Sequence, residues 1–177
     1  PIISPPVDLV IEATGSLTPV DLGEAIAMDE SGIQLIVSNG PTLFPLGSST
    51  IIWTAIDNNG NSAFATQQVD VVDTTPPTIS SVSDIIVEAV VPYDNIIELQ
   101  APSADDTLGV VSVTNDAPES FPIGETIVTW TATDVGGNTS SIEQKITVFD
   151  TTFPILQVPE DIVLEATSLE HNEVHLG

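Results

Sequence analysis

The sequence predicts an all-β protein made of antiparallel β-sandwiches in tandem, and three observations carry this prediction. One pattern of residues occurs twice and begins a third time. The joints between the copies are rich in proline, which removes backbone donors and stops a β-ladder. Between the joints, short runs of β-branched residues alternate with clusters of Gly, Pro, Asn and Asp, as is typical of strands and turns.

The proline-rich joints divide the chain into copies of one unit. The first joint, Asp73-Thr74-Thr75-Pro76-Pro77, returns almost unchanged as Asp150-Thr151-Thr152-Phe153-Pro154. Landmarks inside the units, among them Trp53 and Trp130, are 77 residues apart. We therefore predict a first repeat over residues 1–75, a second over 76–152 and the first two strands of a third over 153–177.

Each unit is expected to contain about seven short strands, a number that fits a small sandwich. Strands are predicted in the first unit at 7–11, 32–38, 49–56 and 67–72. In 51–56 and 128–133, alternate residues share one face of a strand. Trp53 and Trp130 lie on an apolar face of these strands, so we predict that each tryptophan points into the core of its unit. The segments that follow these strands, 57–61 and 134–138, contain Gly, Asn and Asp, which tolerate positive φ. They are therefore predicted to be hairpin loops.

Acidic residues dominate the charge of the chain. There are 26 Asp and Glu against one Lys, and the formal net charge is −25. Such a surface excludes binding to nucleic acid or anionic lipid through a basic face. With 41% hydrophobic residues the acids must decorate a folded core, and divalent cations would relieve their repulsion. No apolar run is long enough for a transmembrane helix, and no Cys is present.

The motifs at the joints and around the second tryptophan resemble those of the hyalin repeat, or HYR domain. They are T-A-T-D-x-x-G-N at 131–138, F-P-x-G ahead of it, D-T-T-P-P at the joint and D-I-x-V-E-A at 84–89. The resemblance covers two whole copies and the opening of a third. It implies immunoglobulin-like modules that occur in tandem in large extracellular or cell-surface proteins and are associated with adhesion.

Carboxylates repeated at each joint, without basic partners, predict a Ca²⁺ site there. In an immunoglobulin-like topology, the loops carrying Asp106 and Asp134 lie at the end of the second unit that faces Asp73. Glu12 lies near the end of the first strand and is expected to approach Asp73 as well. We predict that these four residues bind one Ca²⁺, with Thr75 as a further candidate ligand.

Equivalent positions predict further cation sites. Glu88 and Asp150 would contribute to the second joint, and Asp29 and Asp57 to the N-terminal end of the first unit. Asn61 and Asn138 are possible ligands or simply turn formers, and Asn138-Thr139-Ser140 is also a sequon for N-glycosylation. The alternative for the acids is that they solvate loop tips.

The partial third repeat, 153–177, contains a weaker indication of a metal site. His171, Glu173 and His175 alternate on a predicted strand and could hold a transition metal, although a solvated strand face is the simpler interpretation. Two strands cannot enclose a core. The third repeat is therefore expected to be completed by more of the same chain or by a neighbouring subunit, which would build a filament.

No arrangement of residues typical of an active site is found, so the sequence predicts a non-enzymatic protein. We expect a structural and adhesive segment of a large extracellular or surface protein, with Ca²⁺ between rigid units. Its partners would be other copies in a filament or array, the longer parent chain, or other surface molecules. Two alternatives stay open: an acidic surface-layer array that attracts or filters small cations, and an accessory module of a secreted hydrolase.

Overall fold

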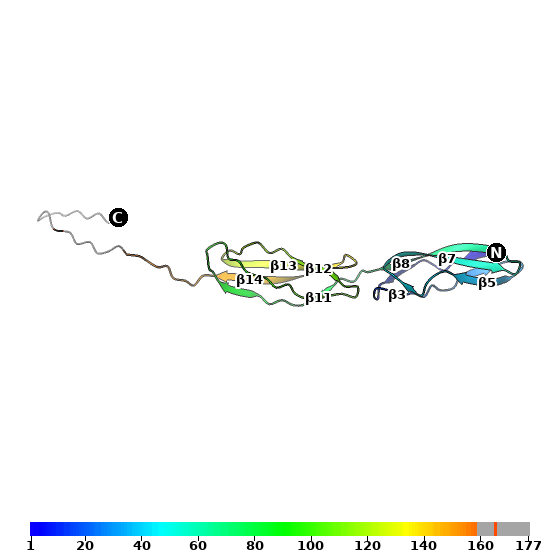
Figure 1. Cartoon of the computed structure of the whole chain (residues 1–177), viewed down its shortest axis with the longest axis horizontal. Helices are drawn as coiled ribbons and strands as arrows, with labels where there is room; N and C mark the ends of the chain where they lie inside the picture. Colours follow the sequence, from blue (N-terminus) through cyan, green and yellow to red (C-terminus); the bar gives the residue numbers. More distant parts are fainter. Residues whose placement is uncertain (159–164, 166–177) are drawn as a thin grey trace.

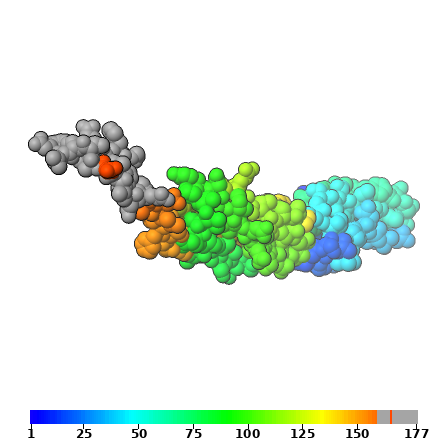
Figure 2. All heavy atoms as spheres, turned by 60° about the vertical axis from the view of Figure 1, so that its left-hand side comes forward, coloured from blue at the N-terminus to red at the C-terminus, as the bar shows by residue number. Residues whose placement is uncertain are grey.

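The computed structural model describes residues 1–158 and residue 165. In this part of the chain the regular secondary structure consists of fourteen β-strands, and no helix suited to crossing a membrane occurs. The strands form two sandwiches, one on each side of the joint at 73–77, and the sandwiches follow one another end to end (Figures 1 and 2). The all-β, immunoglobulin-like class predicted from the sequence is confirmed.

The first sandwich contains β1 to β8. Their bounds are β1 (Ile2–Ser4), β2 (Leu9–Glu12), β3 (Thr18–Pro19), β4 (Ile26–Met28), β5 (Ile33–Ser38), β6 (Leu43–Phe44), β7 (Gly47–Asp57) and β8 (Ser62–Val72). The larger sheet has the order β2-β8-β7-β5, and the pairs β1-β4 and β3-β6 form two smaller sheets.

The second sandwich repeats this plan with β9 to β14. Their bounds are β9 (Thr78–Ile79), β10 (Ile85–Glu88), β11 (Ala104–Asp105), β12 (Val110–Asn115), β13 (Gly124–Asp134) and β14 (Thr139–Phe149). The larger sheet has the order β10-β14-β13-β12, and β9 pairs with β11. A single bridge between Asn95 and Phe121 stands where the first unit has β3 and β6.

One pairing in each large sheet is parallel. β2 runs parallel to β8, with Glu12 opposite Val72, and β10 runs parallel to β14, with Glu88 opposite Phe149. The remaining pairs are antiparallel. The parallel pairing brings the end of an early strand beside the end of the last strand. As a result, Glu12 and Glu88 lie next to the joints that follow their units.

Each core is built around a tryptophan, as predicted. Trp53 is 7% exposed and Trp130 is 2% exposed. Each indole N–H donates to a buried glutamine, from Trp53 to Gln67 Oε1 and from Trp130 to Gln144 Oε1, both at 3.0 Å. The glutamine amide in turn donates to backbone carbonyls, so the tryptophan N–H and the glutamine amide within each core are paired.

The segment after β14 differs from the units before it. Residues 153–158 form no strand, and Phe153, Ile155, Leu156 and Val158 are exposed. The two strands predicted for the third repeat, including His171, Glu173 and His175, lie outside the described residues.

Candidate cation site at the joint

Three of the four acids predicted at the first joint meet there. Asp73 directly follows β8, Asp106 follows β11, and Asp134 is the last residue of β13. One carboxylate oxygen from each of them lies within 4.8 Å of the others. We call Asp73, Asp106 and Asp134 the joint triad. The two sandwiches therefore both contribute carboxylates to one small volume.

Asp134 is fixed by the loop that follows it. Its side chain is buried, and its Oδ1 and Oδ2 accept bonds from the backbone N and Nδ2 of Asn138, at 2.8 and 3.0 Å. Asn138 Nδ2 also lies 3.1 Å from the backbone oxygen of Asp73, which belongs to the other side of the joint. Asn138 is thus both a turn former and a contact between the units. A glycan on its side-chain nitrogen would replace one of these two N–H donors.

Asp106 is held in a tight turn before β12. Its Oδ1 accepts from the backbone N of Leu108 at 2.8 Å, and its carbonyl accepts from Gly109, whose φ is 102°. A positive φ of this size favours glycine. The same turn directs Leu108 onto the core cluster of the first sandwich, so an apolar contact also crosses the joint.

Asp73 has the least satisfied carboxylate of the three. Its Oδ1 accepts a long bond of 3.4 Å from the backbone N of Thr75, and its Oδ2 is buried with no hydrogen-bond partner among the described residues. Burial is the main reason why the pKa of Asp73 is raised, and the charges of Asp134, Asp106 and Glu12 raise it further. A buried, unpaired charge is costly, and a bound cation would remove that cost.

Gly136 packs directly against Asp73. A Cβ at this position would lie 2.6 Å from Oδ2 and 2.7 Å from Cβ of Asp73, both far below van der Waals contact. The first unit has Asn59 at the aligned position, so the repeat itself does not require glycine. The requirement at Gly136 comes from the close approach of the preceding unit.

Glu12 lies outside the joint triad and holds the backbone of the joint. Its carboxylate accepts from Thr74 N at 2.9 Å, from Thr74 Oγ1 at 2.7 Å and from Thr75 Oγ1 at 2.8 Å. These bonds, led by that from the backbone of Thr74, lower the pKa of Glu12. Its predicted role as a direct cation ligand stays a prediction, as does that of Thr75.

The second joint has the same arrangement as far as it is described. Glu88 accepts from the backbone N of Thr151 at 2.7 Å, and Asp150 Oδ1 accepts from the backbone N of Thr152 at 2.9 Å. Glu88 and Asp150 thus correspond to Glu12 and Asp73. The other ligands predicted for this joint belong to residues beyond the second repeat.

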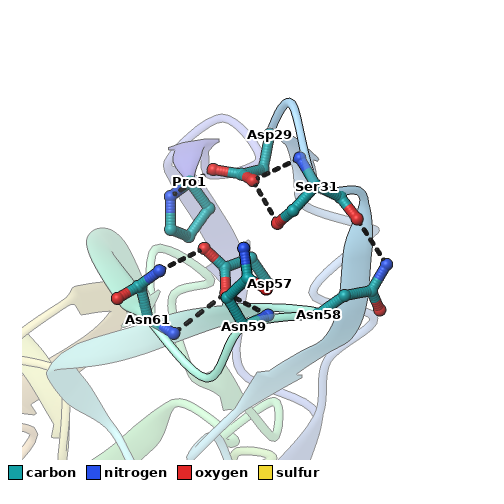
Figure 3. Close-up of polar contacts among 7 residues, drawn as sticks. All are labelled: Pro1, Asp29, Ser31, Asp57, Asn58, Asn59 and Asn61. Atoms are coloured by element: carbon teal, nitrogen blue, oxygen red, sulfur yellow. Dashed lines mark hydrogen bonds and ion pairs between the residues drawn. The ribbon is translucent and has the colours of Figure 1, made fainter.

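The N-terminal end of the first sandwich carries Asp29 and Asp57, which align with Asp106 and Asp134 of the second unit (Figure 3). Asp57 Oδ2 accepts from Asn61 Nδ2 at 2.8 Å, and this amide is the main reason why the pKa of Asp57 is lowered. Asp29 accepts from the backbone N of Ser31 at 2.8 Å and lies 3.0 Å from the Pro1 nitrogen. Its hydrogen bonds with the hydroxyl and backbone N of Ser31 are the main reason why the pKa of Asp29 is lowered.

Within residues 1–158, no basic side chain is paired with the joint triad. The one Lys of the chain, Lys145, forms an ion pair with Glu125 at 3.2 Å. Hard oxygen ligands without basic partners are suited to binding Ca²⁺. Sequence reasoning missed two residues of this site, Leu108 and Gly136. The residues aligned with them in the first unit are Ser31 and Asn59, so the repeat pattern gave no signal for either.

Comparison with known proteins agrees with the motifs. Residues 72–148 match the family model described as HYR domain. The chain is 37% identical to hyalin of Strongylocentrotus purpuratus over 173 residues, 90% of this chain and 14% of that protein. It is also 37% identical to hyalin of Lytechinus variegatus over 153 residues, 79% of this chain and 29% of that protein. The chain therefore spans less than a third of the length of these relatives.

A mammalian relative and two solved structures are also similar. Sushi, von Willebrand factor type A, EGF and pentraxin domain-containing protein 1 of Rattus norvegicus is 30% identical over 158 residues, 84% of this chain and 4% of that protein. Protocadherin Gamma B7 cadherin domains 1–4 align with a TM-score of 0.34 and 12% identity, over 83% of this chain and 50% of that one.

The fibronectin(III)-like modules of Clostridium thermocellum CbhA align with a TM-score of 0.36 and 13% identity, over 90% of this chain and all of that one. The hyalin and sushi-domain relatives are extracellular or cell-surface proteins, which confirms the predicted location. Residues 72–148 are a HYR domain, which confirms for this part of the chain the resemblance seen in its motifs.

Proposed function

We propose that this chain is a non-enzymatic structural and adhesive segment of a larger extracellular protein, and that Ca²⁺ bound at the joints fixes consecutive sandwiches in line. The observation that carries the proposal is the buried Oδ2 of Asp73, which has no partner in the described structure and belongs to a cluster of three carboxylates. Without a cation, this arrangement opposes the contact between the units.

The spacing of the joint triad suits a single Ca²⁺. Oxygen ligands lie about 2.3–2.6 Å from Ca²⁺, so two oxygens on one ion are at most about 5 Å apart. The triad oxygens lie within 4.8 Å of one another. This spacing is compatible with one ion that contacts all three carboxylates. Water, the Asn138 side-chain oxygen or Glu12 could complete the six to eight ligands that Ca²⁺ takes.

Calorimetric titration of Ca²⁺ tests the proposal. The parent protein should bind Ca²⁺ at the first joint, and Asp134→Asn should weaken that binding at least tenfold, because even supporting groups around a metal contribute about 10–100-fold to affinity. Glu143→Gln is the matched control: it removes one carboxylate from an exposed position on β14 and should leave binding unchanged. Equal titrations of Asp134→Asn and the parent would contradict the proposed site.

A second candidate function is an acidic array that attracts or filters small cations, and the net charge of −25 favours it. The same titration separates the two functions. A cation between units gives a small number of sites that survive moderate salt, whereas a diffuse acidic surface gives many weak sites that salt abolishes. The other alternative, an accessory module of a secreted hydrolase, predicts a catalytic domain elsewhere in the same gene.

A further inference from the structure

The outer face of the large sheet in the first sandwich is apolar. Five side chains on β5, β7 and β8 form what we call the apolar face: Leu35, Val37, Ile52, Ile56 and Phe64. Leu35, Val37 and Ile52 are each more than 40% exposed, Phe64 is 67% exposed, and Ile56 is partly exposed. Apolar groups gathered on one sheet, unlike apolar residues scattered singly, form a candidate interaction surface.

The strand register makes this face continuous. Leu35 lies opposite Ile56, and Val37 and Phe64 both lie opposite Thr54, from the two sides of β7. Ile52 lies two residues before Thr54 and on the same face of β7. The five apolar side chains therefore surround Thr54 across three neighbouring strands.

The second sandwich provides an internal comparison. The positions aligned with the five residues of the apolar face carry only small polar side chains: Ser112, Thr114, Thr129, Thr133 and Ser141. Their pairing is the same, with Ser112 opposite Thr133 and Thr114 opposite Thr131. The fold is thus compatible with Ser and Thr over this whole face, and packing within a unit does not account for the apolar residues of the first one.

The apolar face also lacks charge. The side chains between and beside its residues, Thr54, Thr66 and Ser62, are neutral. On a chain with a net charge of −25, two copies can approach through this face without bringing carboxylates together. A basic partner, in contrast, would gain nothing here from its charge. These features favour a second copy of this chain as the occupant.

We propose that the apolar face is a self-association surface, on which the first sandwich of one chain packs against the same face of a second copy. Such a contact is isologous, since each copy contributes the same residues. Three strands at about 4.8 Å spacing and about five residues along each give roughly 250 Å² per copy. A stable interface buries roughly 800 Å² per partner, so this contact is weak alone and gains strength when chains with several contacts lie side by side.

Sedimentation equilibrium from micromolar to millimolar protein tests this proposal. In about 1 M salt, where the Debye length is about 3 Å and charge repulsion is screened, the parent chain should dimerise as its concentration rises. The variant Leu35→Ser/Ile52→Thr/Phe64→Ser carries the residues of the second unit at these positions and should stay monomeric. Circular dichroism establishes whether the triple variant is folded. If it is not, Phe64→Ser alone takes its place and should likewise stay monomeric.

The matched control removes apolar surface elsewhere on the first unit. Ile2→Thr/Ile26→Ser replaces two exposed residues of the β1–β4 sheet by those of the second unit, without a change of charge, and should dimerise like the parent. A parent that is monomeric at millimolar concentration would overturn the proposal. So would loss of dimerisation in the control, or dimerisation of the triple variant.

Cross-linking tests the geometry independently, because the chain has no Cys of its own. Thr54→Cys puts a thiol at the centre of the apolar face, and a bis-maleimide about 10 Å long spans the distance between packed sheets. This variant should form cross-linked dimers. Thr131→Cys, the aligned position of the second unit, should not, and equal cross-linking of both would exclude the apolar face as the contact.

Discussion

Asp73 combines two opposed effects in one side chain. Its buried Oδ2 disfavours the charged form, whereas its place in the joint triad makes it a candidate cation ligand. A raised pKa in the folded state means that Asp73 adds stability below about its ordinary value of 3.8 and loses that contribution as the pH rises through the folded pKa. In the absence of a cation, ionised Asp73 therefore destabilises the joint at neutral pH.

Replacement of this residue should have effects of opposite sign with and without Ca²⁺. In chelator at pH 7, Asp73→Asn should raise the melting temperature, because the neutral amide avoids the cost of a buried charge. In Ca²⁺ it should reduce the rise in melting temperature that the ion gives the parent. Thermal melting in both buffers checks this, and a lower melting temperature of Asp73→Asn in chelator would contradict the account of Asp73.

Gly136 should be sensitive to the smallest possible change. Gly136→Ala adds a Cβ that would lie 2.6 Å from Asp73 Oδ2, and overpacking of this kind costs roughly 1–3 kcal/mol. Gly136 is not among the glycines with positive φ, so the effect would be steric. We expect a lower melting temperature and weaker Ca²⁺ binding.

Asn59→Ala at the aligned position of the first unit is the control for Gly136→Ala. Asn59 already carries a Cβ and is exposed, so its truncation should change the melting temperature little. Similar melting curves for the parent and Gly136→Ala would mean that the joint can open at this point without cost.

At the scale of the element, the long hairpins β7–β8 and β13–β14 organise the two cores. Each hairpin carries the tryptophan on one strand and the glutamine on the other, and the pair is buried. Gln144 bonds to Trp130 Nε1 at 3.0 Å and to the backbone oxygen of Ser83 at 2.7 Å, so it also links the hairpin to the chain before β10.

Loss of this link should destabilise the second sandwich selectively. Gln144→Met keeps the size of the side chain but removes the link to Ser83 and leaves the buried Trp130 N–H without a partner, at about 1–3 kcal/mol for the buried group. In a domain of this size each kcal/mol shifts the melting temperature by roughly 4–8 °C. Calorimetry should show one transition lowered by about 10 °C or more. A uniform shift of both transitions would indicate that the sandwiches unfold as one unit.

Strand prediction succeeded where large apolar side chains alternate along the strand and face a core. Both tryptophans were assigned to the cores from their positions on alternating strands, and the structure confirms this. The last strand was predicted from residue 67, but β8 begins at Ser62. The first half of β8 was missed because small alanines, Ala63 and Ala65, face inward while Phe64 faces solvent, so the hydrophobic pattern there is inverted.

At the scale of the whole molecule, the first joint depends on contacts that no single unit contains. The triad carboxylates could be predicted, because Asp73, Asp106 and Asp134 return at equivalent positions in each copy. Leu108 and Gly136 could not, because each matters only when the next sandwich docks, and neither has an equivalent in the first unit. The repeat thus predicts what the units share, whereas their fit depends on residues in which they differ.

The range of angles between the sandwiches should therefore depend on Ca²⁺, but the contact between them should persist when Ca²⁺ is removed. Chelation leaves three carboxylates in mutual repulsion, which favours opening of the joint. The bonds from Asn138 to the Asp73 carbonyl and from Ser140 to the Pro77 carbonyl remain, as does the apolar contact of Leu108. We expect chelator to broaden the distribution of angles rather than to separate the units.

Small-angle scattering of the two-sandwich protein measures this change. In Ca²⁺ the distance distribution should be that of a narrow, extended particle, and in chelator it should broaden as bent arrangements become populated. Asp134→Asn should scatter in Ca²⁺ much as the parent does in chelator, because its joint lacks one of the three carboxylates. Glu143→Gln should follow the parent in both buffers, since its carboxylate lies on the exposed face of β14. Scattering of the parent that is identical with and without chelator would rule out a cation that fixes the joint, whatever the affinity found by titration.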